Sequence, residues 1–216
     1  LKIVRNRLKN LNILKTGVKI NIEHISTDNK ISFNKNHYFF KKIIISVGKD
    51  INAHSRHKSI VFDKGYLSYV GFFNHNFDHE NIAYEIFNKE GPLAVLPCPS
   101  TNKRKSTFIY STNKKRSNQQ ILTLIKKYFN TSHGKIVFNK AIHKFPVTPH
   151  LKKYNKNFIY IGDTLKSIHP VAGQGWNLGI KDIQTLCNLT EQYSVNSKIL
   201  NSLYYSRRII DSSVYM

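Results

Sequence analysis

The segment NFIYIGDTLKSIHPVAGQGWNLGIKD, residues 157–182, carries the strongest fold signal in this chain. An apolar run leads into Gly162 and Asp163, a glycine-containing loop follows, and a helical pattern begins near Asn177. An uninterrupted apolar strand is typical of a covered, mostly parallel sheet, where ligands lie beyond the carboxyl ends of the strands. We therefore expect a ligand site at Gly162 and Asp163. A purely structural turn is the alternative.

The residue types around this turn suit a flat, partly anionic ligand. Asp163 is the only acid for many residues on either side, and its carboxylate can accept hydrogen bonds from ligand hydroxyls. A helix that starts near Asn177 would direct N–H groups and positive potential at negative charge, and Asp182 is expected to fix that start. Glycines let the backbone approach a flat ring. They are Gly173, Gly175 and Gly179.

The remaining pattern predicts an α/β fold. Helical spacing at 1–15 and 118–132 alternates with strand patterns, including a buried strand at 42–47 and several strands from 65 to about 115. We expect a three-layer domain interrupted by an antiparallel sheet. The predicted boundaries are 1–57 and 151–216 for the outer domain and 58–150 for the sheet.

The charge is strongly basic, with 34 Lys and Arg against 12 Asp and Glu, a net of +22. The basic residues are spread along the chain, which favours a compositional bias towards Lys, Asn and Ile. An anionic membrane surface is the second interpretation, and nucleic acid is the least favoured partner.

Cysteine and histidine spacing predicts neither zinc nor redox chemistry. Cys98 and Cys187 are far apart, and we expect two reduced, buried thiols with a packing role, as in a cytoplasmic protein. The ten histidines include no HExxH, so no metal site is expected. The apolar runs are too short to span a bilayer.

The string GDTLKSIHPVAGQGWNLGIKD resembles the second flavin motif of the class A flavoprotein monooxygenases, and most of all that of their ubiquinone-biosynthesis hydroxylases. GPLAVLPCP, residues 91–99, is similar to part of that subgroup's substrate sheet. The resemblance covers residues from about 40 to 210. It implies an FAD-binding domain interrupted by an antiparallel substrate-binding sheet.

The resemblance also implies roles for single residues. Asp163 matches the acid that binds the ribityl chain of FAD, and Pro170 matches the proline beside the isoalloxazine ring. The loop at Gly173 passes the ring edge, and the amides near Trp176 and Asn177 face its N1–C2=O side. The implied cofactor-binding residues are Gly162, Asp163, Pro170, Gly173, Gln174, Gly175, Trp176, Asn177 and, in the middle motif, Asp50.

The implied activity is hydroxylation of an aromatic ring. NAD(P)H reduces FAD, the reduced flavin activates O2, and one oxygen atom passes to an electron-rich ring. In this subgroup the substrate is a polyprenylated ubiquinone precursor. We therefore expect a cytoplasmic protein, with peripheral association at the inner face of a membrane or with other ubiquinone-biosynthesis proteins.

Two stretches depart from the family pattern. In VGKDINAHSRH, residues 47–57, Gly48 and Asp50 are kept, but Ile51 replaces a glycine and the Ser and Arg are shifted by one position. This motif serves FAD and the nicotinamide in the family, and an exposed polar loop is the alternative. After Gly-Asp, the chain has Thr164, Leu165 and Lys166 instead of a small residue, Ala and His. Lys166 faces either the FAD pyrophosphate or, as we favour, solvent.

Other side chains have a functional and a structural interpretation. His169 is a candidate acid–base or substrate-contacting residue, and fixing the loop is the alternative. Trp176 can pack near the flavin or in the core of the helix start. Arg207 and Arg208 are expected on a solvated face. Four aromatic residues either wall a substrate pocket or belong to the sheet core. They are Tyr66, Tyr69, Phe72 and Phe73.

The 216 residues contain no GxGxxG, the element that cradles the ADP half of FAD in the family. We expect a fragment that lacks this N-terminal unit, binds FAD weakly or not at all alone, and is inactive alone. The alternatives are a flavin hydroxylase or halogenase with another phenolic substrate, and a degenerate basic protein that binds nucleic acid or anionic lipid.

Overall fold

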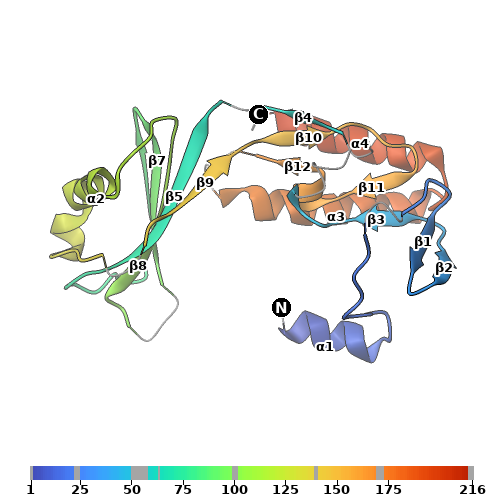
Figure 1. The fold of residues 1–216 in the computed structure, drawn as a ribbon, viewed down its shortest axis with the longest axis horizontal. Coiled ribbons are helices and arrows are strands. Elements are labelled where there is room, and N and C mark those ends of the chain that lie inside the picture. Colours follow the sequence, from blue (N-terminus) through green and yellow to red (C-terminus); the bar gives the residue numbers. More distant parts are fainter. Residues whose placement is uncertain are drawn as a thin grey trace.

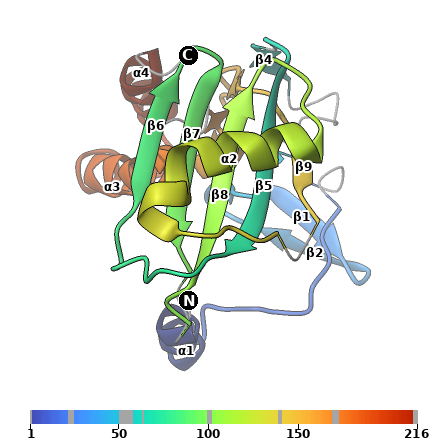
Figure 2. The ribbon, with the colours of Figure 1, turned by 90° about the vertical axis from the view of Figure 1, so that its left-hand side faces the viewer.

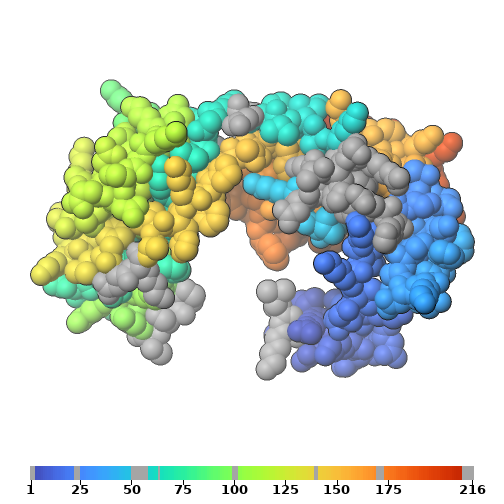
Figure 3. All heavy atoms as spheres, in the orientation of Figure 1, coloured from blue at the N-terminus to red at the C-terminus, as the bar shows by residue number. Residues whose placement is uncertain are grey.

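The computed structural model describes residues 2–21, 25–49, 58–62, 64–98, 102–138, 141–168 and 173–213. They form two lobes side by side (Figure 1). One lobe is an antiparallel sheet covered by a helix, and the other packs two long helices against short strands. The space-filling view shows an open hollow between the lobes on one side of the resulting arch (Figure 3).

The first lobe contains a five-stranded sheet in which every neighbouring pair is antiparallel. Its strands, in spatial order, are β6 (Tyr84–Asn88), β7 (Gly91–Pro97), β8 (Lys105–Thr112), β5 (Tyr66–Asn74) and β9 (His143–Val147). The antiparallel sheet expected from the strand patterns is confirmed.

Helix α2 (Asn118–His133) lies across one face of this sheet (Figure 2). Ser117 and Gln120 form a reciprocal capping box that fixes its start. Ile121, Ile125 and Phe129, spaced by four residues, are buried. They pack on the sheet residues Tyr69, Phe73, Leu93, Val95, Phe108 and Tyr110.

The second lobe joins segments from both ends of the chain. Strand β3 (Ile43–Ile45) pairs in parallel with β11 (Phe158–Tyr160), so the antiparallel sheet is inserted between two strands of one unit. Helices α3 (Gly175–Gln192) and α4 (Lys198–Ser213) cover this pair. The two helices share a hydrophobic core with the strands, to which they contribute Leu186, Leu189, Leu200 and Tyr204. The predicted interrupted α/β architecture is confirmed.

Short elements complete the described structure. They are α1 (Lys2–Asn10), β1 (Lys30–Phe33), β2 (Asn36–Phe39), β4 (Ser59–Val61), β10 (His150–Lys152), η3 (Gly162–Thr164) and β12 (Lys166–Ser167). Strands β12, β10 and β4 form a small sheet, and β10 is bonded to both of the others. The boundaries at 57 and 150 stay predictions.

Candidate functional site

The parallel strands β3 and β11 end at the same edge of their sheet. The side chain of Thr164, in the turn after β11, forms hydrogen bonds with the loop after β3. The Thr164 hydroxyl accepts hydrogen bonds from the backbone N–H groups of Val47, at 2.7 Å, and Gly48, at 2.8 Å, and donates to the Gly48 carbonyl at 3.3 Å. The sequence marks Thr164 only as a departure from the family pattern. A hydroxyl in the turn that follows a buried strand is the signal in the sequence that points to such a contact.

A cavity of about 430 Å³ lies beyond these strand ends. Gly162 has a φ of 58°, a left-handed conformation that glycine adopts at little cost, and the Asp163 side chain that follows is exposed. A Cβ built at Gly162 or at Gly175 would meet no further atom within 4 Å. The lining residues are Ser46, Gly48, Ile161, Gly162, Asp163, Gly175, Trp176, Gly179, Ile180 and Ile183.

The amino-terminal turn of α3 borders this cavity. The helix begins at Gly175, two residues before the expected Asn177, and Gln174 at its N-cap makes no side-chain capping bond. The Asn177 amide nitrogen instead donates to the Gln174 side-chain oxygen at 3.2 Å. No acid lies in the first turn. The Gln174 side chain therefore caps none of the first N–H groups, and the positive potential of this helix end suits a carbonyl oxygen or a negative charge.

The structure brings part of the predicted cofactor set together. Four members of the predicted set line the cavity, namely Gly162, Asp163, Gly175 and Trp176. Gln174 and Asn177 lie at the same helix start, and Gly173 borders a second cavity. Asp50, Ser55, Arg56, His169 and Pro170 lie outside the described residues.

Trp176 is on the surface, so its interpretation as a core residue of the helix start is wrong. Its side chain is 77% exposed at the cavity. Helical periodicity explains this position, because the buried face of α3 contains Leu178, Asp182 and Leu186. The opposite face carries Trp176 with Ile180 and Ile183.

Lys166 and Arg208 are buried, which corrects the expectation that both face solvent. Their exposed fractions are 4% and 1%. Lys166 Nζ lies 3.0 Å and Arg208 Nε 2.6 Å from Oδ1 of Asp182, a carboxylate with no exposed surface. A buried carboxylate requires such partners. Lys166 therefore faces Asp182 and not a pyrophosphate site, whereas Arg207 is exposed as expected.

Further basic groups are buried beside the Gly162–Thr164 turn. Burial is the main cause that lowers the pKa of His150, and the nearby charges of Lys152 and Lys49 lower it further. Burial also lowers the pKa of Lys152 to about 8. Asp182 is the one acid among the buried residues that the structure describes. The protein interior behind the turn is thus rich in basic groups.

A second cavity, of about 350 Å³, lies on the face of the large sheet that α2 leaves free, and it borders Gly173 of the glycine loop. Small and aliphatic side chains of β7 and β8 form its floor. They are Pro92, Ala94, Leu96 and Ile109. Tyr69 and Phe73 lie on the other face under α2, so their interpretation as sheet core is confirmed. Phe72 is 38% exposed and Tyr66 is half-buried, and neither lines this cavity.

The two cysteines differ in environment. Cys98 is buried, and burial raises the pKa of its thiol, in agreement with a packing role. Cys187 is exposed, so the expectation of two buried thiols is wrong for this residue. It follows Leu186 on α3, whose buried face points Leu186 and Leu189 inward and leaves Cys187 outside.

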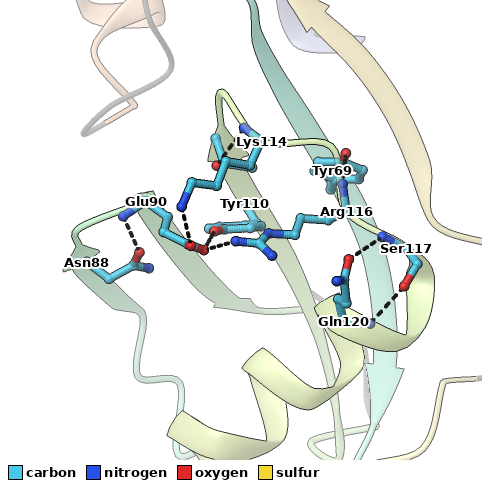
Figure 4. Close-up of polar contacts among 9 residues, drawn as sticks. Tyr69, Asn88, Glu90, Tyr110, Lys114, Arg116, Ser117 and Gln120 are labelled. Atoms are coloured by element: carbon cyan, nitrogen blue, oxygen red, sulfur yellow. Dashed lines mark hydrogen bonds and ion pairs between the residues drawn. The ribbon is translucent and has the colours of Figure 1, made fainter.

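A third cavity, of about 410 Å³, lies near the start of α2 and contains an ion cluster (Figure 4). The Glu90 carboxylate binds Lys114 Nζ at 2.9 Å, the Arg116 guanidinium and the Tyr110 hydroxyl at 3.3 Å. Hydrogen bonds from Lys114 and then Arg116 are the main causes that lower the pKa of Glu90. Both carboxylate oxygens are bonded within the protein, so this cluster clamps the β6–β7 turn to the segment before α2.

The chain is similar to curated hydroxylases of ubiquinone biosynthesis. It is 21% identical to ubiquinone hydroxylase UbiM of Neisseria meningitidis over 86% of this chain and 42% of that protein. It is 33% identical to the ubiquinone biosynthesis monooxygenase COQ6 of Dictyostelium discoideum over 50% of this chain and 21% of that protein. The chain is a homologue of the ubiquinone hydroxylases. It spans less than half the length of either of these relatives.

Solved structures agree on the fold. The flavin-dependent halogenase BrvH from Brevundimonas sp. BAL3 matches with a TM-score of 0.71 at 11% identity, over 97% of this chain and 44% of that one. PqsL of P. aeruginosa matches with a TM-score of 0.67 at 12% identity, over 99% of this chain and 65% of that one. No family model matches the sequence.

Two further properties of the described residues concern membranes and metal ions. None of the helices that the structure describes is long and apolar enough to cross a membrane. Within the same residues, no three His, Cys, Asp or Glu side chains are grouped in a way that could hold a metal ion.

Proposed function

We propose that this chain forms part of an FAD-dependent monooxygenase that hydroxylates the aromatic ring of a polyprenylated ubiquinone precursor, with NAD(P)H and O2. The observation that carries the proposal is the cavity between the parallel strand ends and the start of α3, which the Gln174 side chain does not cap. It coincides with the segment that resembles the second flavin motif, in a chain homologous to ubiquinone hydroxylases.

The residues of the cavity suit a flavin. The exposed Asp163 carboxylate can accept hydrogen bonds from ribityl hydroxyls. The open backbone at Gly162 and Gly175 leaves room for a flat ring system. The first turn of α3 offers N–H groups to the N1–C2=O edge, where negative charge gathers on reduction. Pro170 and Asp50 keep their predicted flavin roles within this proposal.

The chain's own contribution to the reaction is binding, orientation and electrostatics. When bound, FAD supplies the redox centre that accepts a hydride and activates O2. The first turn of α3 stabilises negative charge at one edge of the ring. No acid lies in this first turn to oppose that effect.

The second cavity is the proposed position of the substrate ring. Its floor on β7 and β8 is apolar, and Gly173 of the glycine loop borders it, so a ring on this floor lies next to the flavin cavity. An apolar floor favours an aromatic ring over a charged substrate. The polyprenyl tail is the part of such a substrate that resides in a membrane. We therefore also propose peripheral membrane association, which the net charge of +22 favours on anionic lipid.

Turnover by the full-length protein tests the proposal. We expect NAD(P)H oxidation that depends on a polyprenylated phenol and yields a product heavier by one oxygen atom. A phenol without the prenyl tail is the matched control substrate. Equal turnover of the control would indicate a hydroxylase of soluble phenols. A colourless protein that oxidises no NAD(P)H but binds DNA with a steep salt dependence would favour the basic binding protein.

A further inference from the structure

Asp182 lies at the centre of a buried ion cluster directly behind the candidate flavin cavity. Its side chain has no exposed surface. The two carboxylate oxygens are used differently. Oδ2 accepts the backbone N–H of Gly162 at 2.8 Å, and Oδ1 accepts Lys166 Nζ at 3.0 Å and Arg208 Nε at 2.6 Å. One acid therefore links the cavity turn to two other elements, β12 and α4.

The cations in turn bind backbone groups around Asp182. Arg208 Nη2 donates to the carbonyl of Leu178 on α3 at 3.4 Å, and Lys166 Nζ reaches the carbonyl of Arg208 at 3.4 Å. The cluster thus spans β12, α3, α4 and the cavity turn, so a shift of any one of these elements stretches its hydrogen bonds.

The turn that Asp182 holds carries a residue of the candidate flavin cavity. Gly162 has a positive φ, and its neighbour Asp163 directs an exposed carboxylate at the cavity. Helix α3 also lies close to the turn. A Cβ added at Gly179 would be 3.8 Å from the Cα of Gly162. The hydrogen bond from the Gly162 N–H to Asp182 therefore joins the Gly162–Asp163 turn directly to α3.

We propose that Asp182 is a positioning residue of the flavin site, which fixes the Gly162–Asp163 turn through Oδ2 while Lys166 and Arg208 hold its other oxygen. The contacts of Asp182 do not depend on the proposed flavin function, but the expected effect on FAD binding rests on it. Asparagine cannot replace Asp182, because an amide offers one acceptor oxygen. Either the Gly162 N–H or the two cations then face an NH2 group.

The test compares variants of the full-length protein at a temperature where all are folded by circular dichroism. We expect Asp182→Asn to weaken FAD binding about tenfold or more, because it breaks a hydrogen bond to a charged group. Arg207→Met removes an exposed cation of α4 next to Arg208 but none of the hydrogen bonds of Asp182, and is expected to bind FAD within about threefold of the wild type. Asp78→Asn, an exposed carboxylate of the other lobe, controls for the change in charge.

A second readout does not depend on flavin. Hydrogen exchange at the Gly162 amide is expected to be slow in the wild type and in Arg207→Met, and fast in Asp182→Asn. If Asp182→Asn does not fold, Asp182→Glu takes its place, since it keeps the charge but displaces the carboxylate by one methylene from its position against Gly162.

The outcomes separate the two proposals. A wild-type protein that binds no FAD contradicts the proposed function, and the exchange data still decide the role of Asp182. The inference is overturned if the Asp182 variant binds FAD like the wild type, if Arg207→Met is equally impaired, or if the Gly162 amide exchanges fast in the wild type.

Discussion

Buried polar side chains hold the two halves of the candidate site together. Thr164 is the clearest case, because its hydroxyl satisfies two backbone N–H groups of the loop after β3. We predict that Thr164→Val lowers the free energy of unfolding by roughly 1–3 kcal/mol, since the N–H groups of Val47 and Gly48, which are partly accessible to water, lose their acceptor. Thr164→Ser retains the hydroxyl and is expected to cost less than about 1 kcal/mol. Urea unfolding measures both, and equal losses would contradict the role of the hydroxyl.

A second prediction concerns His133, at the end of α2. Its ring is 1% exposed and lies among the rings of Phe73, Tyr84, Phe129 and His75. Burial, followed by repulsion from His75 and His79, lowers its pKa from 6.5 to about 4. The unfolded chain therefore takes up a proton first as the pH falls. We expect stability to be retained above about pH 6.5 and to decrease by roughly 3 kcal/mol as the pH falls towards 4.

The matched variants for this pH effect are His133→Phe and His143→Phe, of which the second alters an exposed histidine. Urea unfolding at several pH values is expected to show a weaker acid dependence for His133→Phe only. Identical pH profiles for the wild type and His133→Phe would contradict the assignment. Asp78, the acid nearest to this cluster, lies 3.9 Å from His79 and is bound to Lys103 at 3.6 Å, so it does not offset the burial of His133.

Among the strands, the β6–β7 hairpin depends on a single glycine. Gly91 has a φ of 136°, and a Cβ there would lie 1.9 Å from the Ser111 carbonyl oxygen on β8. Gly65 has a φ of 68° but open space around it. We predict that Gly65→Ala costs about 1–2 kcal/mol, the left-handed penalty alone, and that Gly91→Ala costs at least about 2 kcal/mol more. Similar melting temperatures for the two variants would contradict this account of the hairpin.

The helices and strands were largely predictable, whereas the contacts between them were not. Periodicity identified α2 with its buried Ile121, Ile125 and Phe129, because local spacing decides which face of a helix is apolar. It failed for Lys166 and Arg208, because their burial depends on Asp182, which is distant in sequence from both. The sequence next to a charged residue does not show whether that residue pairs with a buried partner elsewhere in the chain.

Across the molecule, two cavities border the glycine loop, with Gly175 lining the candidate flavin cavity and Gly173 the proposed substrate cavity. The turn residues Gly162 and Asp163 were predictable from the motif, because strand, turn and helix start are adjacent in sequence. The floor on β7 and β8 was not, because the alternation of a strand gives two faces and does not say which one α2 covers. The sequence patterns therefore do not show which face of the inserted sheet forms the floor of the proposed substrate cavity.

Flavin titration of the full-length protein and its Asp163→Ala variant tests the central claim most directly. Fluorescence quenching of added FAD gives both dissociation constants, with Asp78→Ala as the control for loss of an exposed acid. We predict that the wild type and the control bind FAD with the same affinity and that Asp163→Ala binds it at least about tenfold more weakly. A wild-type protein that binds no FAD, or an Asp163→Ala variant that binds it equally well, would contradict the placement of the flavin in this cavity.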